Sequence, residues 1–176
     1  MFLFVDTETT GFASGGVQPR VVSIAWMISD RPDKPRVFKR AIVRPVDFEI
    51  PSAAQAVHGI STEKARREGM SLKSVLDDLT LDIRTIRPSY LVAHNLAYDR
   101  PIVEAEYSRI GNSPPLGTLA TECTMLMARR RWPGESAKLS DVYRRLFKNE
   151  MRNAHDASGD VWACAQIFFA LRSYGN

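Results

Sequence analysis

The chain begins with a run of apolar residues, 2–5, that stops abruptly at an acid, Asp6. A short run of this kind, without a polar residue, is typical of a β-strand that is buried on both faces. Because both faces of such a strand need apolar cover, we expect it to lie in a sheet that is flanked by helices. The acid then marks the point at which the buried strand ends.

Other segments show strand and helix patterns in alternation. Residues 21–28 and 36–43 are β-rich and are separated by a turn-like stretch of Asp, Lys and Pro, which predicts an antiparallel pair. Residues 90–93 form another short apolar run, and residues 118–124 are a candidate fifth strand. This order predicts an α/β fold with a five-stranded mixed sheet whose first three strands are antiparallel. Helices are expected over residues 52–57, 61–68, 71–86, 126–131, 139–147 and 157–174, and through Ile102, Val103 and Tyr107 to Gly111.

The composition is that of an ordinary globular protein. Of the 176 residues, 44% are apolar and 25% are charged, which excludes disordered, collagen-like and low-complexity chains. A chain of this length supports one core of ordinary size, so residues 1–176 are expected to form a single domain. The formal net charge of +4 suits a polyanionic ligand but does not by itself indicate one.

No feature of the sequence indicates secretion or membrane insertion. The N-terminus lacks the basic segment of a signal peptide, and no apolar run approaches the length needed to span a bilayer. Cys123 and Cys164 have the spacing of neither a disulfide framework nor a zinc site, so they are expected to be small buried residues in a reducing compartment. We therefore expect a soluble, cytoplasmic protein.

Asp6 and Glu8 stand two positions apart at the end of the first predicted strand. Side chains at this spacing leave the same face of a strand and can converge on one point. Two carboxylates held together repel each other unless one is protonated or a cation lies between them. Hard cations such as Mg²⁺ prefer such oxygen ligands, although a solvated pair of acids is the simpler interpretation of this pair alone.

Two further groups of polar residues lie near the starts of predicted helices. Asp99 follows the strand at 90–93 and a turn, where the helix dipole would stabilise an acid that has no function. His155 and Asp160 lie five positions apart at the start of the last predicted helix, so the histidine is expected in the preceding loop. Taken singly, each group also fits a purely structural role.

The three groups, taken in order, resemble the three exonuclease motifs of the DEDD superfamily. A histidine five positions before the last Asp is typical of its DEDDh branch, which includes the epsilon subunit of bacterial DNA polymerase III, ribonuclease T and oligoribonuclease. The DEDDy branch has a Tyr four positions before that Asp and does not fit, because position 156 is Asp. The resemblance covers residues 3–169 and implies a ribonuclease H-like fold. The matching segments are Asp6-Thr-Glu8-Thr-Thr-Gly, His94-Asn-Leu-Ala-Tyr-Asp99, His155-x4-Asp160 and, similar to epsilon-like members, Val57-His58-Gly-Ile-Ser61.

The resemblance implies a metal-dependent 3′→5′ exonuclease that hydrolyses phosphodiester bonds at single-stranded 3′ ends and releases nucleoside 5′-monophosphates. Asp6 would bridge two divalent cations, Mg²⁺ or Mn²⁺, and Asp99 would support the second ion directly or through water. His155 would be the general base. The catalytic and metal-binding acids would be Asp6, Glu8, Asp99 and Asp160, and the substrate-binding residues Thr9, Phe12, His58 and Asn95.

Several features need separate interpretation. Phe12 could stack on a base or belong to the core, and the sequence does not decide between the two. Tyr98 stands where many members have Phe, and Ala53 replaces an acid that some epsilon-like members carry.

The chain stops at Asn176 without the extension by which the epsilon subunit docks on its polymerase, which favours a stand-alone trimming enzyme. Ribonuclease T and oligoribonuclease act as dimers, so a homodimer stays open, although the sequence identifies no surface for it.

The motifs specify the reaction rather than the sugar. We expect single-stranded DNA to be the favoured substrate, and RNA 3′-end trimming of the oligoribonuclease or ribonuclease T kind is the alternative, because recognition of the 2′-hydroxyl cannot be read from a sequence. A catalytically silent nucleic-acid-binding module and a small-molecule phosphodiesterase are further alternatives, and the presence of all five motif residues argues against the first.

The C-terminal third of the chain is rich in basic residues. They could follow a phosphate backbone or form a solvated helix face. The residues are Arg129, Arg130, Arg131, Arg144, Arg145, Lys148 and Arg152, with Trp132 among them.

Overall fold

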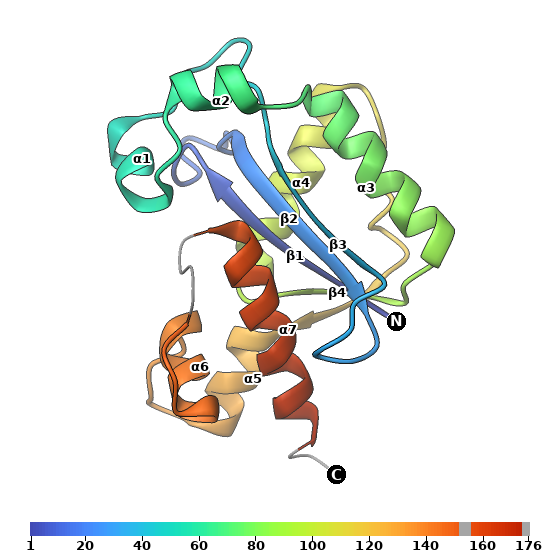
Figure 1. Ribbon diagram of the computed structural model, residues 1–176, viewed down its shortest axis with the longest axis vertical. Coiled ribbons are helices and arrows are strands. Elements are labelled where there is room, and N and C mark those ends of the chain that lie inside the picture. The colour runs from blue at the N-terminus through green and yellow to red at the C-terminus, as the bar shows by residue number, and fades with distance from the viewer. Residues whose placement is uncertain (152–155, 174–176) are drawn as a thin grey trace.

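Five strands form one mixed sheet in the order β3-β2-β1-β4-β5 (Figure 1). The structure is a computed structural model that describes residues 1–151 and 156–173. β1 pairs antiparallel with β2 and β2 with β3, whereas β4 runs parallel to both β1 and β5. This topology confirms the predicted sheet. The strands are β1 (Phe2–Thr9), β2 (Val21–Ser29), β3 (Val37–Ile42), β4 (Tyr90–Ala93) and β5 (Ala120–Cys123).

Helices cover both faces of this sheet. α7 lies across one face with α5 and α6 packed beside it, and α3 and α4 cover the other face (Figure 1). α1 and α2 lie together near the end of the sheet at which β1 finishes (Figure 1). The helices are α1 (Ser52–His58), α2 (Thr62–Glu68), α3 (Leu72–Ile86), α4 (Leu96–Arg109), α5 (Thr124–Arg131), α6 (Leu139–Phe147) and α7 (Ala157–Ser173).

The two faces of β1 are buried in two separate apolar clusters, as its sequence predicts. Leu3 and Val5 pack in a cluster with residues of α3 and α4, whereas Phe4 packs with residues of α7. Because successive side chains of a strand alternate between the faces, the even-numbered residues of β1 face α7. Asp6 and Glu8 therefore lie on the α7 side of the sheet.

β1 continues beyond its apolar run to Thr9, so the expectation that the strand ends at Asp6 is wrong. Its ladder with β2 extends past Glu8, whereas its pairing with β4 stops at Phe4. A ladder of backbone hydrogen bonds on one side keeps the strand extended and does not require apolar side chains. Because β4 is short, the second half of β1 has an open edge, and the acids stand on this half.

The predicted helices are present, with small shifts at their ends. Ser61 and Ser71 accept a hydrogen bond from a backbone N–H in the first turns of α2 and α3, which is the capping role that Ser commonly has at helix starts. α4 ends at Arg109 rather than at Gly111. Both cysteines are free and buried, as expected. Within the described residues, no helix has the length and apolar character that a membrane span requires.

Candidate active site

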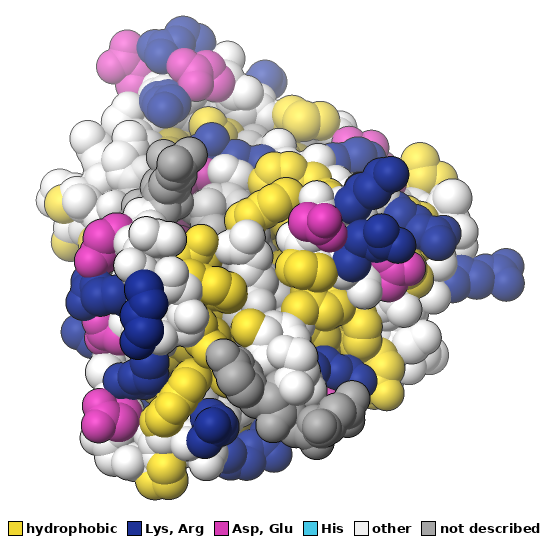
Figure 2. All heavy atoms as spheres, turned by 60° about the horizontal axis from the view of Figure 1, so that its bottom comes forward, with side chains coloured by type: hydrophobic (Ala, Val, Ile, Leu, Met, Phe, Trp, Pro, Cys, Tyr) yellow, Lys and Arg dark blue, Asp and Glu magenta, His cyan; other side chains and the backbone are white. Residues whose placement is uncertain are grey.

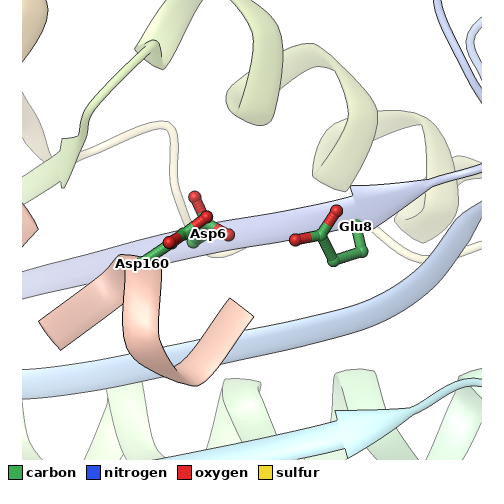
Figure 3. A group of neighbouring side chains, drawn as sticks. All are labelled: Asp6, Glu8 and Asp160. Carbon is green, nitrogen blue, oxygen red and sulfur yellow. The ribbon is translucent and has the colours of Figure 1, made fainter. Parts of the chain in front are cut away.

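Three carboxylates from two elements meet beside the first turn of α7. Asp6 and Glu8 come from β1, and Asp160 comes from α7, which is packed on the same face of the sheet (Figure 3). One carboxylate oxygen from each residue lies within 4.8 Å of those of the other two. Because Asp6 and Glu8 are two positions apart on β1, both side chains reach Asp160, which is more than 150 positions away in the sequence.

Asp99 approaches β1 from its open edge. Its Oδ1 accepts hydrogen bonds from the backbone N–H of Thr7, at 3.1 Å, and from the Thr7 hydroxyl, at 2.8 Å. The carboxylate thus stands where a longer β4 would have supplied a backbone acceptor. Asp99 is only 5% exposed, and it lies outside the group of three close oxygens formed by Asp6, Glu8 and Asp160.

Burial and mutual repulsion make it unfavourable to ionise these acids together. Burial raises the pKa of Asp6 well above its usual value, and the charges of Asp99 and Asp160 raise it further. Burial, followed by repulsion from Asp160, raises the pKa of Glu8 to about 8. Burial also raises the pKa of Asp99 to about 7, against the opposing effect of its hydrogen bonds to Thr7.

This donor set fits a divalent metal ion. Asp6, Glu8 and Asp160 offer three oxygen ligands that converge on one volume, and hard cations such as Mg²⁺ and Mn²⁺ prefer oxygen ligands. A cation would also remove the repulsion that raises the pKa values of these acids. The geometry of the three acids and their electrostatics therefore support the same occupant.

The carboxylates line a cavity of about 850 Å³. Its walls come from β1 and the turn after it, α1, the start of α4 and the start of α6. The cavity brings together eight of the nine site residues singled out in the sequence: Asp6, Glu8, Thr9, Phe12, His58, Asn95, Asp99 and Asp160. The ninth, His155, lies outside the described residues.

Phe12 stands at the cavity with 85% of its surface exposed, so of the two alternatives left open by the sequence the core position is excluded. Its ring makes an edge-on contact with Tyr98, at 5.9 Å between ring centroids. Thr9 behaves differently, because it is buried and its hydroxyl donates to the Gly11 carbonyl oxygen at 2.8 Å. Phe12 therefore presents an open aromatic surface, whereas the hydroxyl of Thr9 is used inside the protein.

His58 and Asn95 lie on different walls of the cavity. His58 Nδ1 accepts a hydrogen bond from the Ile60 N–H, and its Nε2 is buried without a hydrogen bond to any described residue. Burial lowers the pKa of His58, with the backbone of Thr9 acting in the opposite direction. Asn95 is the residue before α4, and its exposed side chain makes no capping hydrogen bond. The Asn95 side chain is thus open to a ligand, whereas His58 Nε2 is shielded from solvent and interacts with the backbone of Thr9.

Two residues at the cavity were not predicted as functional. Lys138 is the only Lys or Arg among the described residues that line it, and it immediately precedes α6. His94 accepts from the Thr124 hydroxyl through Nδ1 and donates from Nε2 to the Ala137 carbonyl oxygen at 2.8 Å, which fixes the backbone just before Lys138. A Lys directly before an amphipathic helix is too common in sequences to have been singled out.

Two arginines of the basic C-terminal third are paired with acids on the surface, and Arg152 lies outside the described residues. Arg144 pairs with Glu150 at 2.6 Å, and Arg145 pairs with Glu135 at 3.1 Å and lies over the ring of Trp132. Figure 2 shows Lys and Arg side chains interspersed with Asp and Glu on the face that it presents. For Arg144 and Arg145 the structure therefore favours a solvated helix face over a surface that binds a phosphate backbone.

Comparison with known proteins decides the family. The family model RNase T, described as an exonuclease, matches residues 3–168. The chain belongs to this exonuclease family. A relative, three prime repair exonuclease 2 of Homo sapiens, is 28% identical over 194 aligned positions, which cover 95% of this chain and 81% of that protein. The expected 3′→5′ exonuclease of the DEDD superfamily is thus confirmed.

Solved structures of other exonucleases share the fold. Zinc-bound E. coli Exonuclease I in complex with single-stranded DNA gives a TM-score of 0.82 at 19% identity over 98% of this chain. This chain spans only 40% of the Exonuclease I chain. Exonuclease X in complex with 5′ overhanging duplex DNA gives 0.67 at 24% identity, covering 100% of this chain and 94% of that one. These likenesses confirm the ribonuclease H-like fold.

Proposed function

We propose that this exonuclease removes nucleotides one at a time from single-stranded 3′ ends, preferably of DNA, and releases nucleoside 5′-monophosphates. The observation that carries the proposal is the convergence of Asp6, Glu8 and Asp160 in a cavity that also holds the exposed ring of Phe12. Exonuclease I, which shares the fold, binds single-stranded DNA oligonucleotides. Residues 1–176 would act as one exonuclease domain.

The acids would hold two divalent cations, Mg²⁺ or Mn²⁺. Asp6, Glu8 and Asp160 would bind the first ion, and Asp6 together with Asp99 would bind the second. Such a pair of ions activates water and neutralises charge on the attacking and leaving oxygens of a phosphodiester. The fit of the first three residues rests on their close oxygens, and that of Asp99 on its position beside β1.

Other residues would hold the substrate and move the proton. His155 would accept the proton of the attacking water, a role that suits its usual pKa. The terminal base would stack on the ring of Phe12, because an aromatic ring accepts any base without regard to sequence. Asn95 and His58 would contact the sugar and phosphate from different walls of the cavity. Thr9 would contribute mainly through its backbone, since its hydroxyl is bonded to Gly11.

A time course on 5′-labelled single-stranded DNA and RNA of one sequence, with Mg²⁺ or Mn²⁺, tests the proposal. We expect a ladder that shortens one nucleotide at a time, faster on DNA, and that disappears with EDTA and in Asp6→Ala. Asp33→Ala is the matched control, because Asp33 is an exposed acid between β2 and β3, and it should cleave like the wild type.

The other outcomes of this time course are equally informative. A faster ladder on RNA would contradict the preference for DNA and favour RNA 3′-end trimming. Unchanged turnover in Asp6→Ala would refute the assignment of the site. Metal-independent binding of the oligonucleotide without any cleavage would indicate a silent binding module.

A further inference from the structure

Two adjacent residues in the first turn of α4 attach this helix to β1. Asp99 binds Thr7, as described above, and Tyr98 binds the turn that follows the strand. The Tyr98 hydroxyl donates to the Gly11 carbonyl oxygen at 2.7 Å and lies 2.6 Å from the Thr9 hydroxyl, which is itself 2.8 Å from the Gly11 carbonyl oxygen. Three oxygens thus lie in a closed triangle that holds two hydroxyl protons: both hydroxyls donate to the Gly11 carbonyl oxygen, or one donates to it and the other donates to the neighbouring hydroxyl.

This triangle fixes the beginning of a glycine-rich loop. Gly11 has a φ of 137°, in the region that favours glycine, whereas Gly15 and Gly16 form a turn that is closed by two backbone hydrogen bonds between Ser14 and Val17. Phe12 lies between these two fixed points, and its ring is 85% exposed and lacks packing in the core. The hydrogen bonds at Gly11 and the edge-on contact with Tyr98 hold the side of Phe12 that faces the cavity, in addition to the backbone pair of Ser14 and Val17 that closes the loop behind it.

We propose that Tyr98 is a positioning residue, whose hydroxyl holds Gly11 so that the ring of Phe12 is preorganised to stack on the 3′-terminal base. This inference rests on the proposed function and goes beyond it by assigning base stacking to a pair of residues. An exposed ring that is already fixed loses less conformational entropy when a base stacks on it. The phenol of Tyr98 would act through Phe12 and would not itself be a catalytic residue.

The chain offers a matched pair of variants for the test. Tyr98→Phe keeps the ring beside Phe12 and removes only the hydroxyl. Tyr107→Phe is the control, because Tyr107 lies on the same helix and its hydroxyl also has two partners, Thr80 at 2.8 Å and the Leu76 carbonyl oxygen at 3.1 Å, but it does not line the cavity. A general loss of stability would affect both variants, whereas a positioning role would affect only one.

The first measurement compares steady-state kinetics on two oligonucleotides, one with a normal 3′-terminal nucleotide and one whose terminal nucleotide lacks its base. We expect Tyr98→Phe to raise the KM for the normal end by about three- to tenfold, the range of one hydrogen bond, with kcat nearly unchanged. On the abasic end, Tyr98→Phe, Tyr107→Phe and wild type should be alike. An equal effect of Tyr98→Phe on both ends, or no effect on either, would overturn the proposal.

The second measurement follows binding without turnover, so it also works if the protein cleaves neither oligonucleotide. The probe is an oligonucleotide with a fluorescent adenine analogue at its 3′ end, bound in the presence of Ca²⁺. Stacking on Phe12 should quench it in wild type and Tyr107→Phe, less in Tyr98→Phe, and least in Phe12→Ala. Adding Tyr98→Phe to Phe12→Ala should change nothing further. The proposal would be contradicted by equal quenching in Tyr98→Phe and wild type, by the absence of quenching in wild type, or by additive effects in the double variant. If the protein cleaves neither oligonucleotide but shows normal quenching, only the proposed function is contradicted.

Discussion

At the scale of single residues, the carboxylates that would bind the metal ions oppose the folding of the metal-free chain. Glu8 and Asp99 have pKa values of about 8 and about 7, and burial is the main cause of both shifts. An acid that resists ionisation in the folded protein but ionises freely in the unfolded chain lowers stability as the pH rises. Functional groups are commonly kept in such unfavourable surroundings because their ligand provides the missing interaction.

This electrostatic conflict predicts a pH dependence of stability. Between its usual pKa of 4.5 and about 8, Glu8 keeps a proton in the folded state that it has lost in the unfolded state, so the free energy of unfolding falls as the pH rises through this window. Thermal unfolding in EDTA should therefore show a falling Tm across it. Glu8→Gln should flatten the decline, whereas Glu63→Gln, an exposed control on α2, should not. Parallel curves for wild type and Glu8→Gln would contradict the prediction.

Metal addition should reverse this decline. A divalent cation competes with protons for the same carboxylates, so it binds better as the pH rises. We expect Mn²⁺ to raise the Tm of the wild type more near pH 8 than near pH 5, and to raise it little in Glu8→Gln. The same shift at both pH values would indicate that the ion binds elsewhere.

At the scale of the elements, the start of α6 is a part of the cavity that the sequence did not reveal. Lys138 stands there among carboxylates and apolar groups, and the hydrogen bond from His94 to the Ala137 carbonyl oxygen fixes the backbone next to it. His94 and Ala137, which this hydrogen bond joins, are 43 positions apart in the sequence. An exposed lysine whose neighbours come from such distant segments has no local signature.

We expect Lys138 to contact a phosphate of the bound strand. Lys138→Gln should raise the KM for single-stranded DNA with little effect on kcat. It should also lower the slope of log binding constant against log salt concentration by about 0.7, the value for one phosphate contact on a single strand. Lys34→Gln is the control, since Lys34 is an exposed lysine in the turn between β2 and β3. If Lys138→Gln leaves the salt slope unchanged, the ammonium group of Lys138 does not contact a phosphate of the bound DNA.

At the scale of the whole molecule, the packing of α7 on the sheet determines where Asp160 lies. Phe168 of α7 lies 4.8 Å from Phe2 and 5.4 Å from Phe4, measured between ring centroids. Such tilted and edge-on aromatic contacts add to the stability that burial provides. This aromatic cluster joins the helix that carries one acid to the strand that carries the other two.

Removing the centre of this cluster should destabilise the fold. Phe168→Ala should lower the free energy of unfolding by about 3–5 kcal/mol, as expected when a large buried aromatic side chain is truncated. Phe38→Ala, which removes a 44% exposed ring on β3, should cost much less. Urea unfolding followed by circular dichroism measures both. Equal losses in the two variants would show that the cluster does not anchor α7.

Most of the local elements and the four acids could be predicted from the amino-acid sequence. The continuous apolar run of β1 and the turn-like stretch between β2 and β3 depend on residues a few positions apart, so their patterns are visible in the chain. The same holds for the pairing of Asp6 with Glu8, because a spacing of two fixes a common face. The resemblance of the three motifs to those of the DEDD superfamily then grouped these two acids with Asp99 and Asp160.

The surroundings of these residues follow from the packing of the sheet and its helices. This packing extended β1 past Asp6, because a ladder with β2 holds the backbone whatever the side chains are. It exposed Phe12, bonded the hydroxyl of Tyr98 to Gly11 and brought Lys138 to the cavity. Each of these outcomes depends on contacts between segments that are distant in the chain. Spacing along a sequence does not encode them, because they arise only when the sheet and its helices pack together.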